Sequence, residues 1–75
     1  MRPRKISRLK ADEVVRILHH YSFVLVSQRG SHQKWRNYST GKQVIVPYHQ
    51  GKELPLGTLR SIIDGSGIPE NEFKN

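Results

Sequence analysis

The sequence contains no cysteine, so neither a disulfide bond nor a thiolate zinc site can stabilise it. It has no apolar run near the ~20 residues that a membrane span needs. Its basic N-terminus also lacks the apolar stretch of a secretory signal. The 75 residues are too few for a two-domain enzyme. We therefore expect a single domain over residues 1–75, with a thin core, in the cytoplasm.

Acidic residues are scarce in the first half of the chain. The 13 Lys and Arg outnumber the 6 Asp and Glu, which gives a formal net charge of +7. Residues 1–37 hold nine of the basic and two of the acidic residues, whereas residues 38–75 hold four of each. A surface of this sign attracts polyanions and accelerates their capture. The charge therefore indicates a nucleic acid, an anionic membrane surface or an acidic protein as partner.

The hydrophobic pattern predicts one helix followed by three strands. Apolar residues recur on one helical stripe over residues 11–20, with two acidic residues in the first turn. Three β-rich segments follow at 23–28, 32–38 and 43–48. Only short turns separate these segments, so we expect them to pair as an antiparallel meander. Residues 1–8 are rich in Arg and are expected to form a flexible basic arm.

A second helix is predicted after a polar loop. Thr58 is expected to cap it, and Gly65 and Gly67 are expected to end it. Pro69 can begin one further helical turn that returns Phe73 to the core. The order is α-β-β-β-α and the fold class is α+β. We expect a three-stranded antiparallel sheet with both helices packed on one face and the other face open to solvent.

The middle strand distributes its side chains between these two faces, because successive side chains alternate. With Trp35 in the core, the open face carries His32, Lys34, Arg36 and Tyr38. The alternative makes Trp35 an external platform for RNA bases and buries both cations, which costs more than exposing one indole. We therefore expect Trp35 in the core.

His32 is the strongest candidate for chemistry among the four histidines. It follows a Gly-Ser turn, and Arg29, Lys34 and Arg36 lie within a few positions of it. Nearby cations disfavour protonation, so a neutral imidazole can accept a proton from a ribose 2′-hydroxyl and later return one to the leaving oxygen. The cations would hold the scissile phosphate. By itself, however, an isolated histidine is more often a surface residue that hydrogen-bonds a turn.

His49 follows the third strand, where it can either join the same site as a second acid or base or cap the loop. The histidine spacing argues against a metal site, because no two histidines are four residues apart and no acidic residue falls between 14 and 52. RNA carries its own nucleophile, so a nuclease of this kind needs no metal. We expect no cofactor.

Four motifs taken in order match a known family. Gly30-Ser31-His32 is followed by Trp35-Arg36, by Pro-Tyr-His-Gln-Gly-Lys-Glu-Leu at 47–54, and by Gly-Thr-Leu-Arg at 57–60. A lone Gly-Ser-His is a weak signal, whereas this succession is specific. Over roughly residues 6–73 the chain resembles the HicA toxin family.

The resemblance implies a double-stranded-RNA-binding-domain-like fold and the function of a type II toxin–antitoxin system. Members of the family are mRNA interferases that cut RNA independently of the ribosome and without a required metal. The histidine of the Gly-Ser-His motif is their catalytic residue, which is His32 here. A HicB antitoxin neutralises them by covering the active face. Many members carry a second histidine where this chain has Gln33, so His49 is a candidate to replace it.

We therefore expect an endoribonuclease that cleaves mRNA, with His32 as the catalytic residue and Arg29, Lys34 and Arg36 as phosphate contacts. Its expected partners are mRNA and a HicB-type antitoxin, with no membrane and no DNA bound by the chain itself. Two alternatives remain. A non-catalytic RNA-binding module of the same fold would not depend on His32 for any cleavage. A protein-binding domain would show RNA affinity that changes little with salt.

Overall fold

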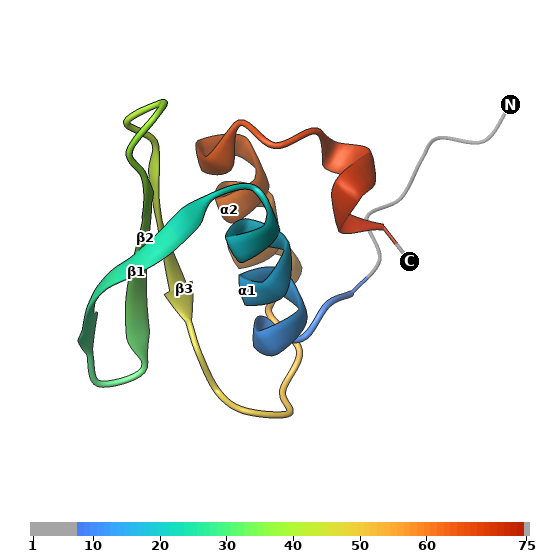
Figure 1. Ribbon diagram of the computed structural model, residues 1–75. Coiled ribbons are helices and arrows are strands. Elements are labelled where there is room, and N and C mark those ends of the chain that lie inside the picture. Colours follow the sequence, from blue (N-terminus) through green and yellow to red (C-terminus); the bar gives the residue numbers. More distant parts are fainter. Residues whose placement is uncertain (1–7, 75) are drawn as a thin grey trace, which may run out of the picture.

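The computed structural model describes residues 8–74 and has the predicted order of a helix, three strands and a helix. The elements are α1 (Ala11–His20), β1 (Phe23–Arg29), β2 (His32–Asn37), β3 (Gln43–Pro47), α2 (Leu56–Ser66) and the short 3-10 helix η1 (Glu70–Phe73). Figure 1 shows the sheet as one layer and the two helices as a second layer on one side of it, which confirms the predicted α+β class. Apart from the exposed Arg8, the predicted basic arm lies outside the described residues.

The sheet is antiparallel with the order β1-β2-β3, as the short turns predicted. Leu25, Trp35 and Val44 stand opposite one another across the three strands. The register then shifts between Leu25 and Ser27, so Val26 is an extra residue in β1. Such a β-bulge changes the alternation of every side chain that follows it in the strand.

The core lies between the sheet and the helices. Trp35 is only 7% exposed, which confirms its predicted place in the core. Phe73 is fully buried, so the turn after Pro69 does return it to the core as expected. The other buried apolar residues come from α1, β1, β3 and α2 and from the segments flanking the helices: Leu9, Ala11, Val14, Leu18, Phe23, Val44, Val46, Leu54, Leu59, Ile62, Ile63 and Ile68.

The predicted start of α2 was wrong, and of the two glycines predicted to end the helix only Gly67 does so. The helix begins at Leu56 after Pro55, and the amide of Leu59 already donates to the Pro55 carbonyl at 2.9 Å. Thr58 is therefore inside the first turn rather than the cap. At the other end Gly65 is still helical, and Gly67 ends the helix with a left-handed φ of 71°.

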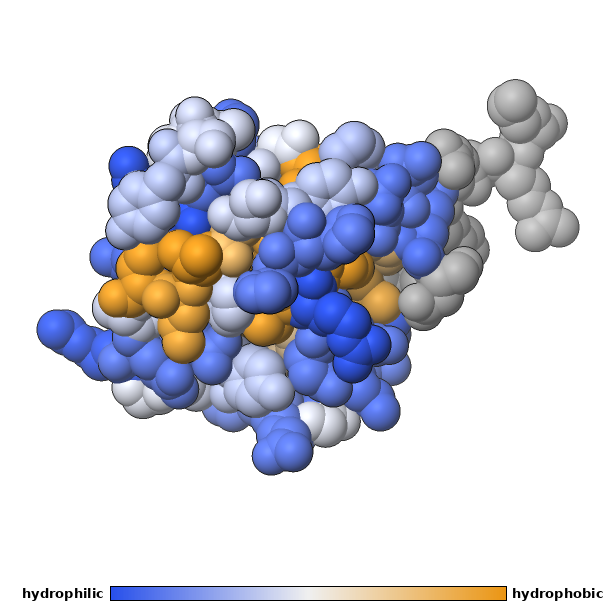
Figure 2. Space-filling view, viewed as in Figure 1, coloured by the Kyte–Doolittle hydropathy of each residue, from blue (hydrophilic) through white to orange (hydrophobic). Residues whose placement is uncertain are grey.

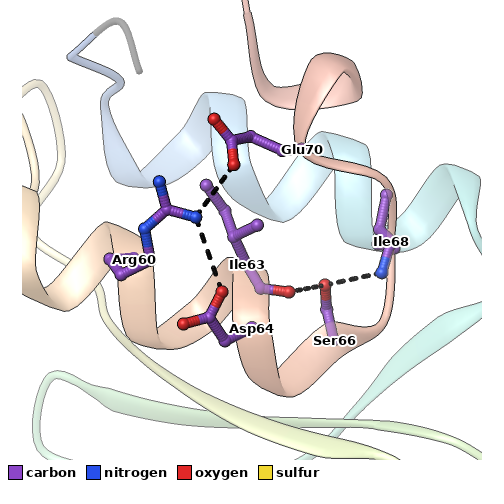
Figure 3. A network of polar contacts seen from close by, with 6 residues as sticks. All are labelled: Arg60, Ile63, Asp64, Ser66, Ile68 and Glu70. Carbon is purple, nitrogen blue, oxygen red and sulfur yellow. Dashed lines mark hydrogen bonds and ion pairs between the residues drawn. The ribbon is translucent and has the colours of Figure 1, made fainter. Parts of the chain in front are cut away.

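The C-terminal end of α2 is closed by polar contacts (Figure 3). The Ser66 hydroxyl donates to the Ile63 carbonyl at 2.9 Å and accepts from the Ile68 amide at 3.1 Å. Arg60 pairs with Asp64 at 3.5 Å and with Glu70 at 3.0 Å, so it joins α2 to η1. The Glu70 carboxylate raises the pKa of Arg60 above its usual value.

Candidate functional site

The face of the sheet opposite the helices carries side chains from all three strands. Residues directly opposite in an antiparallel pair project to the same face. The register therefore places three rows on this open face: Val24, Arg36 and Gln43; Ser27, Lys34 and Ile45; Arg29, His32 and Pro47. Lys34 and Arg36 flank the buried Trp35, in agreement with the predicted alternation.

Three of the predicted site residues meet in one hollow of this face. The hollow has a volume of about 380 Å³ and is lined by Ser27, Arg29, His32, Lys34 and Ile45. A volume of this size suits a ligand of a few heavy groups, such as a phosphate with its ribose. Ser27 and Ile45 were not identified from the sequence, because their place depends on the register of β1 and β3 against β2.

The turn between β1 and β2 sets the position of His32. Arg29 and His32 are directly opposite, with only Gly30 and Ser31 between them. Gly30 has a φ of 60°, a value that two-residue hairpin turns require and that glycine adopts without strain. The Ser31 carbonyl accepts a 2.7 Å hydrogen bond from the amide of Tyr48, so the residue that follows β3 also holds the turn. The imidazole itself is exposed.

A chain of side-chain hydrogen bonds supports this hairpin from its other face. The indole Nε1 of Trp35 donates to Oε1 of Gln33 at 3.1 Å, and Nε2 of Gln33 donates to Oε1 of Gln28 at 3.4 Å. Nε2 of Gln28 then donates to the carbonyl of Gly30 at 3.0 Å. Gln33 thus points away from His32 and links the core to the turn.

The structure does not bring His49 into the hollow. The amide of Lys52 donates to the His49 carbonyl at 3.0 Å, so His49 begins a turn after β3. Its side chain is exposed and is not among those lining the hollow around His32.

Arg36 lies at the other end of the open face from His32. Its guanidinium carbon is 5.2 Å from the centre of the Tyr38 ring, and its Nη1 is 3.5 Å from Oε1 of Gln43. Of the three predicted phosphate contacts, Arg29 and Lys34 therefore share the hollow with His32, whereas Arg36 does not.

The cations of the open face are not neutralised by neighbours. Within residues 8–74, salt bridges are confined to Arg60 with Asp64 and Glu70. No group of three His, Cys, Asp or Glu side chains in that range could hold a metal ion. Positive charge without a carboxylate partner remains available to an anion from solution.

Apolar side chains accompany this charge. Figure 2 shows an apolar patch on the surface over β1. Of the exposed apolar residues, the register places Val24 of β1 and Ile45 of β3 on the open face, where they are 43% and 44% exposed. Leu25 and Val26 of β1 are 45% and 37% exposed, but Leu25 is opposite Trp35 and projects to the other face. No helix within the described residues is long and apolar enough to cross a membrane.

Fold and site together define a small α+β protein with a basic, partly apolar sheet face and a histidine in its hollow. A family model described as the HicA toxin of bacterial toxin–antitoxin systems matches residues 11–68, which is most of the chain. The chain therefore belongs to the HicA toxin family, and its role is that of the toxin in such a pair. A search among curated proteins found no match.

Proposed function

We propose that this toxin is an endoribonuclease that cleaves mRNA independently of the ribosome, with His32 as general acid and base. The observation that carries the proposal is the meeting of His32, Arg29 and Lys34 in one open hollow, where no carboxylate of residues 8–74 pairs with either cation. Membership of the HicA toxin family supports it further.

The chemistry balances with the groups present. The neutral imidazole of His32 accepts the proton of the ribose 2′-hydroxyl, and the 2′-oxygen attacks the adjacent phosphorus. The bond from phosphorus to the 5′-oxygen breaks, and the imidazolium returns its proton to that oxygen. The products are a 2′,3′-cyclic phosphate and a 5′-hydroxyl end. Arg29 and Lys34 would offset the negative charge that grows on the phosphoryl oxygens in the transition state.

A HicB-type antitoxin is the proposed protein partner. The uncovered basic face would attract an acidic surface, and an antitoxin bound there would block the hollow. Binding to the folded toxin alone would also stabilise it by mass action. Growth arrest by the toxin that co-expression of the antitoxin fails to relieve would contradict this part of the proposal.

The test of the nuclease uses a defined single-stranded mRNA in a buffer with a metal chelator. We expect the wild-type protein to cut it and His32→Ala to lose at least ~100-fold in rate, as removal of a general acid–base does. His19→Ala, which removes an exposed histidine of α1, is the matched control and should cut normally. Equal cleavage by the His32→Ala and wild-type proteins would exclude the mechanism. RNA binding without any cleavage would favour a non-catalytic RNA-binding module.

A further inference from the structure

Tyr38 is an aromatic side chain that the fold itself does not use. It is 71% exposed, far more than any other large apolar side chain among the exposed ones, whose values lie between 37% and 45%. It follows β2 directly, and the guanidinium of Arg36 lies 5.2 Å from its ring centre. One ring face is thus engaged by a cation, while most of the ring remains in contact with solvent.

The backbone that carries Tyr38 is held firmly at its base. Oδ1 of the buried Asn37 accepts from the amides of Ser39 and Thr40 at 2.8 and 3.1 Å, and its Nδ2 donates to the Tyr21 carbonyl at 3.0 Å. The Asn37 amide donates to the Lys42 carbonyl at 2.9 Å. The ring is therefore presented from an ordered turn, which lowers the entropy lost when a ligand stacks on it.

Through its contact with Arg36, the Tyr38 ring also lies next to the last of a column of functional side chains on β2. His32, Lys34 and Arg36 project to the open face at alternate positions, and two residues of a strand span about 6.6 Å. This interval is comparable to the spacing of successive phosphates along an extended single strand of RNA. A strand cleaved at His32 and lying along β2 would meet one of these side chains per nucleotide.

From this alignment we propose that Tyr38, with Arg36 against its ring, stacks an unpaired base of the substrate about three nucleotides from the phosphate at His32. The inference rests on the proposed function and specifies its substrate as unpaired RNA. Aromatic rings beside a cationic track are the general means of holding single-stranded nucleic acid, and they accept any base because every base has a π-face. In a duplex both faces of a base are covered by its neighbours, so the Tyr38 ring finds no exposed base face on which to stack.

The experiment measures binding to the His32→Ala protein, which cannot cut its ligand under the proposed mechanism. The ligand is a short single-stranded RNA in which an abasic nucleotide is placed at each position in turn. We expect Tyr38→Ala to weaken binding of the intact RNA by about 5- to 100-fold, and Tyr38→Phe to leave it within about twofold. Leu56→Ala, which truncates an exposed apolar residue of α2, is the matched control and should change nothing.

The decisive result is the coupling between protein and RNA. At one position in the RNA, the abasic nucleotide should weaken binding to the protein that retains Tyr38 by the same factor as the Tyr38→Ala substitution does. At that position it should have no further effect on binding to the Tyr38→Ala protein. Additive losses at every position would overturn the stacking proposal. So would equal affinity for single-stranded and duplex RNA, or a Tyr38→Ala protein that loses only its affinity for the antitoxin.

The outcomes separate this proposal from the nuclease proposal. Wild-type cleavage together with unchanged RNA binding by Tyr38→Ala would overturn stacking and leave the nuclease intact. Coupling at one position without cleavage by the wild-type protein would support stacking and reject the nuclease. Absence of any single-stranded RNA binding would overturn both.

Discussion

Arg29 faces His32 across the β1–β2 hairpin because Val26 is an extra residue in β1. Val24 lies on the open face, opposite Arg36, and strict alternation from Val24 would direct Arg29 to the face that the helices cover. The bulge shifts the alternation by one, and Arg29 joins His32 and Lys34 in the hollow. The positive charge around the imidazole thus depends on an irregularity in an edge strand.

This arrangement predicts that the three cations of the open face are not equivalent. Arg29→Gln and Lys34→Gln should each slow cleavage more than Arg36→Gln, because only the first two lie in the hollow with His32. Arg29→Gln and Lys34→Gln should each also make the fall of log affinity with log salt shallower by about 0.7, the value for one phosphate contact on a single strand. The measurement is RNA binding by these variants in the His32→Ala protein over a range of salt concentrations.

Arg16→Gln is the control for this series. It removes the same charge from an exposed position of α1, in the layer that lies behind the sheet. It should leave both the cleavage rate and the salt slope near their wild-type values. If all four variants behave alike, the RNA responds only to net charge, and the hollow has no particular role in binding it.

Much of this site could be predicted from the sequence, because it depends on simple alternation along β2. One buried residue, Trp35, fixes the direction of His32, Lys34 and Arg36 on the same strand. The bulge at Val26 could not be predicted, since nothing in the run of β-rich residues 23–28 distinguishes the extra residue from its neighbours. The contribution of Ser27 depends on this bulge, and that of Ile45 depends on the register of β3 against β2, so neither was identified from the sequence.

The errors at α2 have a similar origin. Thr58 has a side chain suited to an N-cap, but Pro55 already supplies a fixed φ of −57°, and its carbonyl accepts the first helical hydrogen bond from the amide of Leu59. Gly65 resembles a helix terminator, but its α position packs close to Val44, with only 3.2 Å left for an added Cβ. Glycine is present there because β3 and α2 approach closely, and this long-range contact leaves no local signal.

Gln33 gives a second prediction. Replacing it with Leu would leave the Trp35 indole N–H without a partner and break the chain of hydrogen bonds to the Gly30 carbonyl. We expect the free energy of unfolding to fall by about 1–3 kcal/mol, the cost of an unsatisfied buried polar group. Denaturant unfolding measures this loss, and an unchanged midpoint would show that these hydrogen bonds do not stabilise the hairpin.

Gln33→His tests whether a histidine at this position can act beside His32. The side chain at this position projects to the same face of the sheet as Trp35, whereas His32 projects to the other face. The added imidazole should therefore contribute no second acid or base. The pH profile of cleavage should keep its shape, whereas a new titrating group in that profile would show that the hairpin can turn this side chain into the hollow.

Ser66 gives a fourth prediction, which concerns stability alone. Its buried hydroxyl joins the Ile63 carbonyl to the Ile68 amide and so closes the end of α2 (Figure 3). Ser66→Ala leaves the Ile68 amide unpaired and should cost about 1–3 kcal/mol. In a domain of this size each kcal/mol lowers the melting temperature by roughly 4–8 °C. Ser61→Ala, at an exposed position of the same helix, should change stability by less than about 0.5 kcal/mol.

The contact between α1 and η1 gives the last prediction, on pH. A hydrogen bond to the Glu72 carboxylate raises the pKa of the Tyr21 phenol above its ordinary value of 10.0, with burial and the charge of Glu72 adding to the shift. The folded protein therefore holds this proton more tightly than the unfolded chain. The resulting stabilisation is fully present at pH values below the pKa of Tyr21 in the unfolded chain. It is lost as the pH rises through the pKa of Tyr21 in the folded protein.

Glu72→Gln should move the pKa of Tyr21 back toward its ordinary value and remove this part of the alkaline pH dependence. The phenolate absorbance of the wild-type and variant proteins measures the first effect, and unfolding at two alkaline pH values measures the second. Glu53→Gln is the control, because the backbone of Glu53 forms an isolated β-bridge with that of Lys10 at the start of α1, about 15 Å of helix away from Tyr21. If both substitutions shift the tyrosine titration equally, the shift comes from net charge and the contact of α1 with η1 does not cause it.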